Sequence, residues 1–430
     1  MNLGANVTRA RIGRSPHRSM ARFAYALTMA SGTNPPVEGW KGAALGSDLA
    51  SPDHRVRTDY WREIDRILLS LADNNELNGL LHALEGIFPV TAASRLEMLD
   101  PGSKALSLLR SSRAGPPKSR TLRHEPHPLD FEWFFTERSS SYLARHAVGD
   151  NVLCLGTPSL AKPLSALGRR VTLVDQNLST LREIAQESPD VALLEASLPA
   201  NPQTLEIYDT IYLDPPWSVR DLQSWLNLAW HHSRPGTTIH VPLLQRLVRP
   251  SAPAERNAIL ELASQMGEWE LRPTAIHYQV PRFEYEVLRH FDISMTTPWR
   301  IADHLLVTIS AIPGRSLVVP SLPAELSRWI TMHIAGQTIK IRRNINGTDE
   351  RPLVAYVPGC SSFLLPTVSS RDPRRGAVEL WTSRNRVARI ADTERVIESL
   401  TSIANSCPHE SRGSLFHDDD LQMIDQLLGV

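Results

Sequence analysis

The 430-residue sequence has little cysteine, almost no lysine and no long apolar run. Its three cysteines, Cys154, Cys360 and Cys407, lie far apart and form no CxxC pair, so the sequence predicts neither a disulfide framework nor a zinc site. No stretch approaches the roughly 18 consecutive apolar residues of a membrane span, and the N-terminal residues lack the apolar core of a secretion signal. We therefore expect a protein of the reducing cytoplasm, without a membrane partner.

The charges are balanced, with 46 Lys and Arg against 46 Asp and Glu, which excludes a wholly basic nucleic-acid binder but allows a local basic face. Only five of the basic residues are lysines. The arginines are planar donors that suit phosphate and carboxylate, although a GC-rich genome produces the same bias. The hydrophobic fraction of 42% excludes a disordered or collagen-like chain.

The chain divides into five segments of different composition. Residues 1–57 are rich in Gly, Pro, Ser and Arg, with eight Lys and Arg against three acids, and we expect a flexible basic arm. Apolar residues at helical spacing predict a helical module over 58–110, and a Pro-, Ser- and Arg-rich stretch predicts a linker over 111–129. Residues 130–312 alternate apolar strands with helices, and residues 313–430 indicate an accessory α+β domain.

The helical module has two interpretations. Helices are expected from Asp59, over 76–87 and over 91–99, and three short helices are typical of a winged-helix or helix-turn-helix unit that binds nucleic acid. A plain helical cap on a catalytic domain fits the same pattern, so the sequence leaves both open.

Within residues 130–312, short apolar runs alternate with helical segments. The expected strands are 151–156, 170–175, 191–195, 208–214, 237–242 and a last run near 299–312. Near-continuous apolar strands between helices indicate a parallel sheet that is buried on both faces, and therefore an α/β fold of the Rossmann-like kind. In the accessory domain, hairpins are expected at Asn346-Gly347 and around 383–385, followed by helices over 393–403 and from Asp418.

The strongest motif is Asp214-Pro215-Pro216-Trp217, directly after the fourth expected strand. Ligands of open α/β sheets bind outside the carboxyl ends of the strands. The two prolines lock the backbone and withhold N–H donors, so their carbonyl groups remain as acceptors. The Asp214 carboxylate and the Pro215 carbonyl can accept the N–H bonds of an amine, while Trp217 stacks on a planar ring or faces a cation. This amine receptor would aim the nitrogen at an electrophile; the alternative is a strand-ending turn with Trp217 in the core.

A cofactor turn is expected at Gly156-Thr157-Pro158-Ser159, after the first strand. With no GxGxxG motif, binding of a pyrophosphate is poorly supported. Asp175 ends the next strand, 19 residues after Gly156, where an acid accepts ribose hydroxyl groups in nucleotide-binding folds. Either Glu195 or Ser197, at the end of the third strand, would face an adenine. S-adenosylmethionine (SAM) carries no phosphate and needs only such a turn and such an acid.

These residues resemble class I SAM-dependent methyltransferases that act on amino groups and carry (Asp/Asn/Ser)-Pro-Pro-(Tyr/Phe/Trp) after strand four. The mRNA adenosine methyltransferases have the reverse motif order. The chain is similar to the group containing probable N6-adenine methyltransferases, elongation-factor lysine methyltransferases and the zinc-knuckle ribosomal RNA adenine methyltransferase. That group has an aromatic segment, a helix and a Pro-Ser turn, and residues 131–135, 139–146 and 156–159 look like these pieces.

The resemblance covers about residues 130–312 and implies a Rossmann-like, seven-stranded methyltransferase sheet. It implies cofactor contacts at Gly156, Thr157, Pro158 and Asp175, and an amine site at 214–217. Trp217 replaces the more usual Phe or Tyr of the motif. The flanking domains have no such match.

Aromatic residues also gather in two segments near the expected strand ends. The candidate substrate-binding residues are Phe131, Trp133, Phe134, Tyr278, Arg282 and Phe283. Stacking combined with phosphate contact explains this mixture, and so does a packed ribbon or helix with an exposed arginine edge. No His, Cys or carboxylate cluster has metal-ligand spacing, so no metal is expected.

The sequence thus predicts methyl transfer from SAM to a nitrogen atom, with adenine N6 of RNA or DNA as the first expected acceptor. Trp217 and the basic arm favour it, and the base would have to be flipped or single-stranded to enter the pocket. Protein lysine is the second expectation. A branched-polyamine aminopropyltransferase and a cofactor-less binding module are further alternatives, and the oligomeric state is not indicated.

Overall fold

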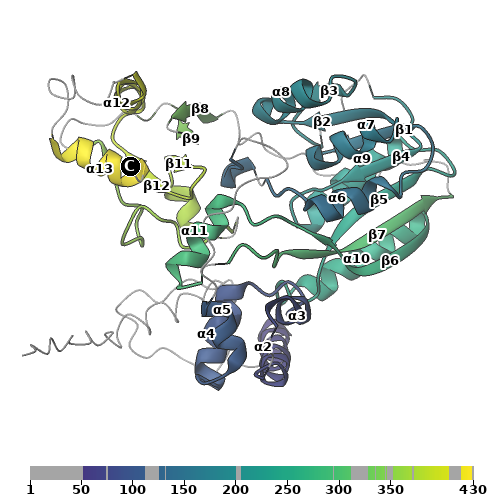
Figure 1. The fold of residues 1–430 in the computed structure, drawn as a ribbon, viewed down its shortest axis with the longest axis horizontal. Coiled ribbons are helices and arrows are strands. Elements are labelled where there is room, and N and C mark those ends of the chain that lie inside the picture. Colours follow the sequence, from purple (N-terminus) through teal and green to yellow (C-terminus); the bar gives the residue numbers. More distant parts are fainter. Residues whose placement is uncertain are drawn as a thin grey trace, which may run out of the picture.

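The computed structural model places three parts around one central helix, α11 (Arg282–His290) (Figure 1). It describes residues 52–73, 76–111, 125–130, 132–199, 205–293, 295–310, 328–334, 336–343, 345, 352–369, 372–405 and 418–428. The predicted basic arm up to residue 51, most of the predicted linker, and Phe131 lie outside these residues.

The central part is a seven-stranded sheet with the order β3-β2-β1-β4-β5-β7-β6. The strands are β1 (Asn151–Leu155), β2 (Arg170–Asp175), β3 (Ala192–Glu195), β4 (Thr210–Leu213), β5 (Thr238–Leu244), β6 (Gly267–His277) and β7 (Ile301–Ile309). The first five run parallel, and β7 lies antiparallel to both β5 and β6. This is the Rossmann-like methyltransferase sheet that the sequence predicts.

Helices cover both faces of this sheet, which is why its strands are apolar throughout. Val152 and Cys154 of β1 pack with α6 (Glu137–Ala144), α7 (Ala161–Ala166) and α8 (Leu178–Glu187). Leu153 and Leu155 alternate with them and pack with α9 (Val219–His231) and α10 (Ala252–Met266) on the other face.

The sequence analysis missed β6 and did not decide between a ribbon and a helix for the segment that contains α11. The β6 strand lies at the edge of the sheet, and most of its residues are exposed or half-buried, so it lacks the apolar run of the other strands. A bulge between Arg272 and Ile276 interrupts its register, and Thr274 there has φ +51°. The polar residues and the bulge together remove the regular apolar pattern by which a strand is recognised in a sequence.

The N-terminal part is helical. It contains α2 (Pro52–Ser70), α3 (Leu77–Ala83), α4 (Pro89–Leu99) and α5 (Lys104–Ser111). The α2 helix begins inside the segment that we expected to be an arm, and α5 was not expected. Between Pro52 and Ser111 the described residues include no strand, so the wing of a winged helix has no counterpart there.

The helical part packs directly on the central one. The Tyr60 hydroxyl donates a hydrogen bond of 2.9 Å to the Leu247 carbonyl, just after β5. Arg246 pairs with both Glu63 and Glu85. These contacts are those of a helical cap on the loop that follows β5.

The C-terminal part contains a five-stranded sheet, β10-β12-β11-β9-β8. Its elements are β8 (Trp329–Ile334), β9 (Gln337–Arg342), β10 (Val354–Ala355), β11 (Leu380–Thr382), β12 (Val387–Ile390), α12 (Thr393–Asn405) and α13 (Asp418–Leu428). The hairpin expected around 383–385 is confirmed, with Asn385 at φ +59°. The other hairpin differs from expectation, because β9 pairs with the preceding β8 around Gly336. Asn346 and Gly347 lie outside the described residues.

Residues 125–130 join the C-terminal sheet to the central part. The buried Lys340 ammonium of β9 pairs with the Asp130 carboxylate. A ring nitrogen of His127 lies 3.0 Å from the Trp381 carbonyl, and the Ser383 hydroxyl donates to Glu125 at 2.9 Å. A buried ion pair and two hydrogen bonds therefore fix this connection.

We expect Lys340→Met to lower the free energy of unfolding by about 3–5 kcal/mol, because it leaves the Asp130 carboxylate buried and unpaired. The double variant with Asp130→Asn should recover part of this loss. Lys104→Met is the matched control, because Lys104 pairs with Asp73 at the surface and should change stability by about 1 kcal/mol or less. Urea denaturation and hydrogen exchange of the β9 amides measure the loss of stability in each variant. Equal losses in the two single variants would contradict the role of the buried pair.

Candidate active site

The predicted cofactor turn and the predicted amine receptor lie side by side. The β1 strand pairs with β2 on one side and β4 on the other, so Gly156, Asp175 and Asp214 follow three adjacent strand ends. The Asp214 amide donates to the Leu155 carbonyl at 3.3 Å, and the Gly156 amide donates to the Val174 carbonyl at 2.9 Å. The two motifs, about 60 residues apart in the chain, therefore form one site at the carboxyl edge of the sheet.

Gly156 is required by its surroundings. Its φ is +59°, a conformation that residues with a side chain rarely adopt. A Cβ atom there would lie 2.8 Å from the ring of Trp225 in α9 and 3.8 Å from the Asp214 carbonyl oxygen. The single glycine of the turn thus lets β1 end directly against the tetrapeptide.

The rest of the turn is buried and is tied to the upstream aromatic segment. Thr157, Pro158 and Ser159 are all buried, and the short 3-10 turn Pro158–Leu160 leads into α7. The Ser159 hydroxyl accepts a hydrogen bond of 3.4 Å from the Phe135 amide. The Pro-Ser turn and the aromatic segment, which the resemblance treats as separate pieces, are therefore in direct contact.

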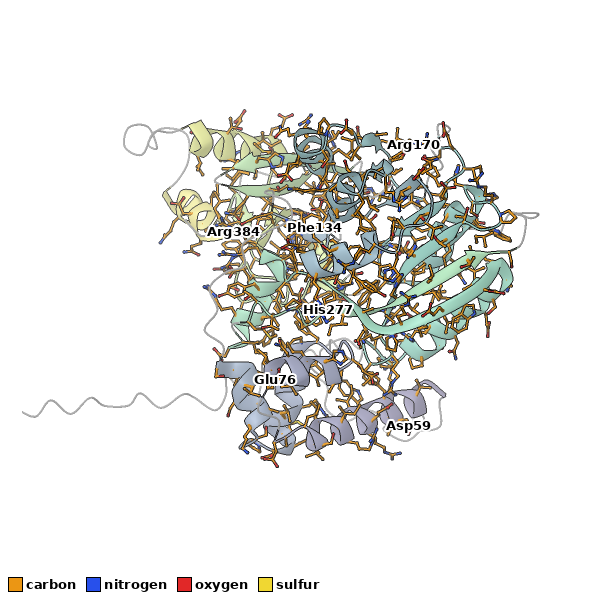
Figure 2. All side chains as sticks on the ribbon, turned by 45° about the vertical axis from the view of Figure 1, so that its right-hand side comes forward. Asp59, Glu76, Phe134, Arg170, His277 and Arg384 are labelled. Carbon is orange, nitrogen blue, oxygen red and sulfur yellow. The ribbon has the colours of Figure 1, made fainter. Side chains whose placement is uncertain are left out.

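The aromatic segment also pairs with the chain at the end of β6; Figure 2 labels one residue of each, Phe134 and His277. The Thr136 amide donates to the His277 carbonyl at 2.9 Å, and the Gln279 amide donates to the Phe134 carbonyl at 2.8 Å. Phe134 is buried, in the same core cluster as Cys154 of β1.

Acidic groups line the edge next to the turn. Asp175 is half-buried and accepts a hydrogen bond of 2.8 Å from the Asn177 amide, which begins α8. Glu195 is exposed and lies opposite Asp175 in the register of β2 and β3. Glu132 was missed by the sequence analysis. The Glu132 carboxylate accepts hydrogen bonds from the side-chain amide of Asn177 at 2.6 Å and from the Thr180 hydroxyl at 3.1 Å.

The Asp214 carboxyl lies in an aromatic, largely dry environment. The Tyr278 hydroxyl donates to Asp214 Oδ1 at 2.8 Å. Burial raises the pKa of Asp214 to about 7, and the Tyr278 hydrogen bond and the Arg300 charge oppose this rise only in part. The Trp217 ring is half-buried and meets Tyr278 edge-on at 5.7 Å. This carboxyl therefore titrates near neutral pH, in the range that suits proton exchange with an amine.

The face of Trp217, expected to receive a substrate, is covered by the protein's own Arg300. The Arg300 guanidinium carbon lies 4.0 Å from the Trp217 ring centre and 4.4 Å from that of Trp133. Sequence reasoning missed Arg300, because it directly precedes β7, far from both motifs in the chain. Arg300 reaches the site because β7 inserts into the sheet as an antiparallel strand.

Glu284 adds a second buried carboxyl group. Its side chain is 3% exposed, burial raises its pKa to about 7, and the Arg300 charge opposes this rise. Phe283, a predicted substrate residue, packs edge-on against Trp133 at 5.7 Å. Both residues come from α11, which therefore forms one wall of the site.

Arg282 is the predicted residue that the structure does not bring to the site. Its guanidinium pairs with Glu286 at 2.8 Å on another face of α11. Glu286 borders a cavity of about 250 Å³ between α11 and the C-terminal part. The cavity is lined by Glu286, Arg289, His290, Asp292, Ser362, Leu364 and Arg386. The helical period of α11 explains the difference, since adjacent residues of a helix point in different directions.

Two classes of site find no support in the part of the chain that the structure describes. No three His, Cys, Asp or Glu side chains gather there as a metal would need. None of its helices combines the length and the apolar character needed to cross a membrane.

We expect Gly156→Ala to lower the free energy of unfolding by about 1–3 kcal/mol more than Gly168→Ala, because only the first adds a clash with Trp225 to the backbone strain. Gly168 is the matched control: its φ is +75° and nothing lies within 4 Å of an added Cβ. Urea denaturation measures the difference. Equal losses would show that Trp225 moves away freely and that the close approach is not a constraint.

We expect Glu284→Gln to flatten the pH dependence of stability. The folded protein holds the Glu284 proton more tightly than the unfolded chain, because the folded pKa is about 7 and the usual value is 4.5. This stability is fully present below the unfolded pKa and is lost as the pH rises through the folded pKa, a change on the order of 3 kcal/mol.

Urea denaturation across this pH range tests the expectation. Glu261→Gln, on the exposed side of α10, is the control. The same decline with pH in wild type and Glu284→Gln would refute the raised pKa.

No family model matches the chain, and no curated protein matches it. Among solved structures, a branched-chain polyamine synthase mutein from Thermus thermophilus is similar at 15% identity and a TM-score of 0.45, over 62% of this chain and 95% of that one. The glycopeptide N-methyltransferase MtfA with bound SAM is similar at 20% identity and a TM-score of 0.22, over 24% of this chain and 48% of that one. TrmN from Thermus thermophilus is similar at 15% identity and a TM-score of 0.28, over 40% and 47%. These are weak likenesses, and the methyltransferase fold of the chain is defined by its own strand order.

Proposed function

We propose that the protein is a SAM-dependent N-methyltransferase that acts on adenine N6 in nucleic acid. The observation that carries this proposal is the contact between the tetrapeptide and the cofactor turn, where the Asp214 amide bonds the Leu155 carbonyl at 3.3 Å. An acceptor amine at Asp214 and a methyl donor at Gly156 would share one strand edge, which is the positioning that methyl transfer needs.

The residues of the turn suit SAM. Gly156, Thr157 and Pro158 form a tight turn at the carboxyl edge of the sheet, and the donor carries no phosphate that would need a longer glycine-rich loop. Asp175 and Glu195 supply carboxylate oxygens for the hydroxyl and amino groups of an adenosine. When bound, SAM supplies an electrophilic methyl group on a positively charged sulfur.

The chain's own residues would bind and deprotonate the acceptor. The Asp214 carboxylate and the Pro215 carbonyl accept the N–H bonds and point the nitrogen lone pair at the methyl carbon. Transfer of the methyl group would leave positive charge on the acceptor nitrogen. The ionised Asp214 carboxylate stabilises that charge and accepts the released proton, for which a pKa near 7 is well placed.

The aromatic walls favour a planar acceptor. The rings of Trp217 and Trp133 flank the Arg300 guanidinium, and Phe283 packs edge-on against Trp133. Each can contact a base that has left its stack, as base-modifying enzymes require. Adenine offers both a flat ring and the exocyclic amine that Asp214 would hold.

One observation favours a second candidate. Asp214 and Glu284 are two carboxyl groups within an aromatic enclosure, and such enclosures also receive ammonium ions. Protein lysine methylation is therefore the second candidate, and transfer of an aminopropyl group to a polyamine is a variant of it. A binding module without a cofactor is the non-enzymatic alternative, and calorimetry with SAM separates it from the others.

We expect Asp214→Ala to lower methyl transfer by about 100-fold or more while SAM affinity stays within a few-fold, because Asp214 would touch the acceptor rather than the donor. The assay follows labelled methyl from SAM to RNA, DNA, protein and spermidine. Asp190→Ala, in the exposed turn before β3, is the control. Unchanged transfer in Asp214→Ala would refute the site, and transfer to protein alone would refute adenine as the acceptor.

A further inference from the structure

The Arg300 guanidinium occupies the position that an acceptor cation would take. It lies over Trp217 at 4.0 Å, over Trp133 at 4.4 Å and over Tyr278 at 5.6 Å. Three aromatic rings around one cation form the kind of enclosure that recognises ammonium groups. In this structure, a residue of the chain itself fills that enclosure.

Stability alone does not account for this placement. Arg300 Nε is buried without a hydrogen-bond partner, and so is Glu284 Oε2. Asp214 and Glu284 act on the Arg300 charge electrostatically, and no ion pair within 4 Å joins either of them to it. A buried N–H donor without a hydrogen-bond partner costs free energy, and stacking of the guanidinium on aromatic rings restores only part of it.

The backbone of Arg300 is anchored at the site. It is fixed by the Tyr278 amide, which donates to the Arg300 carbonyl at 3.0 Å. Its neighbour Ile301 begins β7 and pairs with His277 of β6. An acceptor that displaces the guanidinium from Trp217 therefore still lies near the anchored Arg300 residue.

We infer that Arg300 is a specificity-determining residue that excludes cationic amines from the acceptor site and leaves a neutral planar base as the acceptor. Without Arg300, two carboxyl groups and three aromatic rings would attract an ammonium group. With Arg300, the attraction is already met, and a second cation at this depth is repelled. A neutral base meets no such repulsion, and its ring acceptors suit the unpaired guanidinium donors. This inference rests on the proposed function, because only a transferase has an acceptor substrate.

The test compares Arg300→Ala and Arg300→Gln, which remove the charge, with Arg300→Lys, which keeps it. Arg375→Ala is the matched control, because Arg375 lies over the Trp381 ring at 4.6 Å, away from the site. Calorimetry measures binding of methylguanidinium and tetramethylammonium, the two probe cations. Transfer assays compare spermidine and a lysine peptide with an adenine-containing RNA.

We expect Arg300→Ala and Arg300→Gln to bind the probe cations about tenfold or more tightly than wild type, Arg300→Lys and Arg375→Ala. The ratio of transfer to spermidine or lysine over transfer to RNA should rise by a similar factor in the two neutral variants. Unchanged cation binding in the folded neutral variants would overturn the inference. Failure of both to fold while Arg300→Lys folds would also overturn it, because the charge would then be structural.

The two proposals fail separately. If wild type transfers no methyl group to any acceptor, the proposed function is wrong, whereas the cation-binding measurements still report whether Arg300 closes the enclosure. If wild type methylates RNA and the neutral variants gain neither cation binding nor activity on amines, only the role of Arg300 is wrong.

Discussion

The placement of the Arg300 guanidinium over three aromatic rings is the constraint on which the candidate site depends. Four separate parts of the chain converge on Arg300, which directly precedes β7: Trp133 precedes α6, Trp217 follows β4, Tyr278 follows β6, and Glu284 lies in α11. These parts meet only because β7 inserts antiparallel between β5 and β6. The sheet order that defines the fold therefore also assembles the site, and a change in either would disturb both.

The central fold could be predicted from the sequence because its strands are buried on both faces. The run from Arg170 to Asp175 is apolar between two charged ends, and the predicted strand matches β2 residue for residue. The β6 strand could not be found in this way, since it lies at the sheet edge and breaks its register at a bulge. The difference is physical: burial on two faces leaves a continuous apolar signal, whereas an exposed edge accepts nearly any residue.

For the candidate site, too, the sequence predicted some residues and missed others. Gly156 and Asp214 each follow a clear apolar strand, and parallel strands place such residues at one edge. Glu284 and Arg300 carry no local signal. Each is a single charged residue whose role comes from long-range packing. Only the structure shows that Arg300 lies over Trp217 and that Glu284 acts on the Arg300 charge. The sequence also could not show that Arg300 lies over the Trp217 ring, since the two residues are 83 positions apart in the chain.

The distance between Arg300 and its carboxyl neighbours decides what the site can do chemically. A direct ion pair would hold the pKa of Asp214 well below neutral and would satisfy both charges, leaving neither group for a ligand. The structure instead has the guanidinium stacked on rings, and burial outweighs its charge, so the pKa of Asp214 rises to about 7. The carboxyl group can then exchange a proton near neutral pH while the guanidinium keeps its donors available. Aromatic stacking holds the guanidinium near the two carboxyl groups without a direct ion pair. All three groups therefore remain available to a ligand.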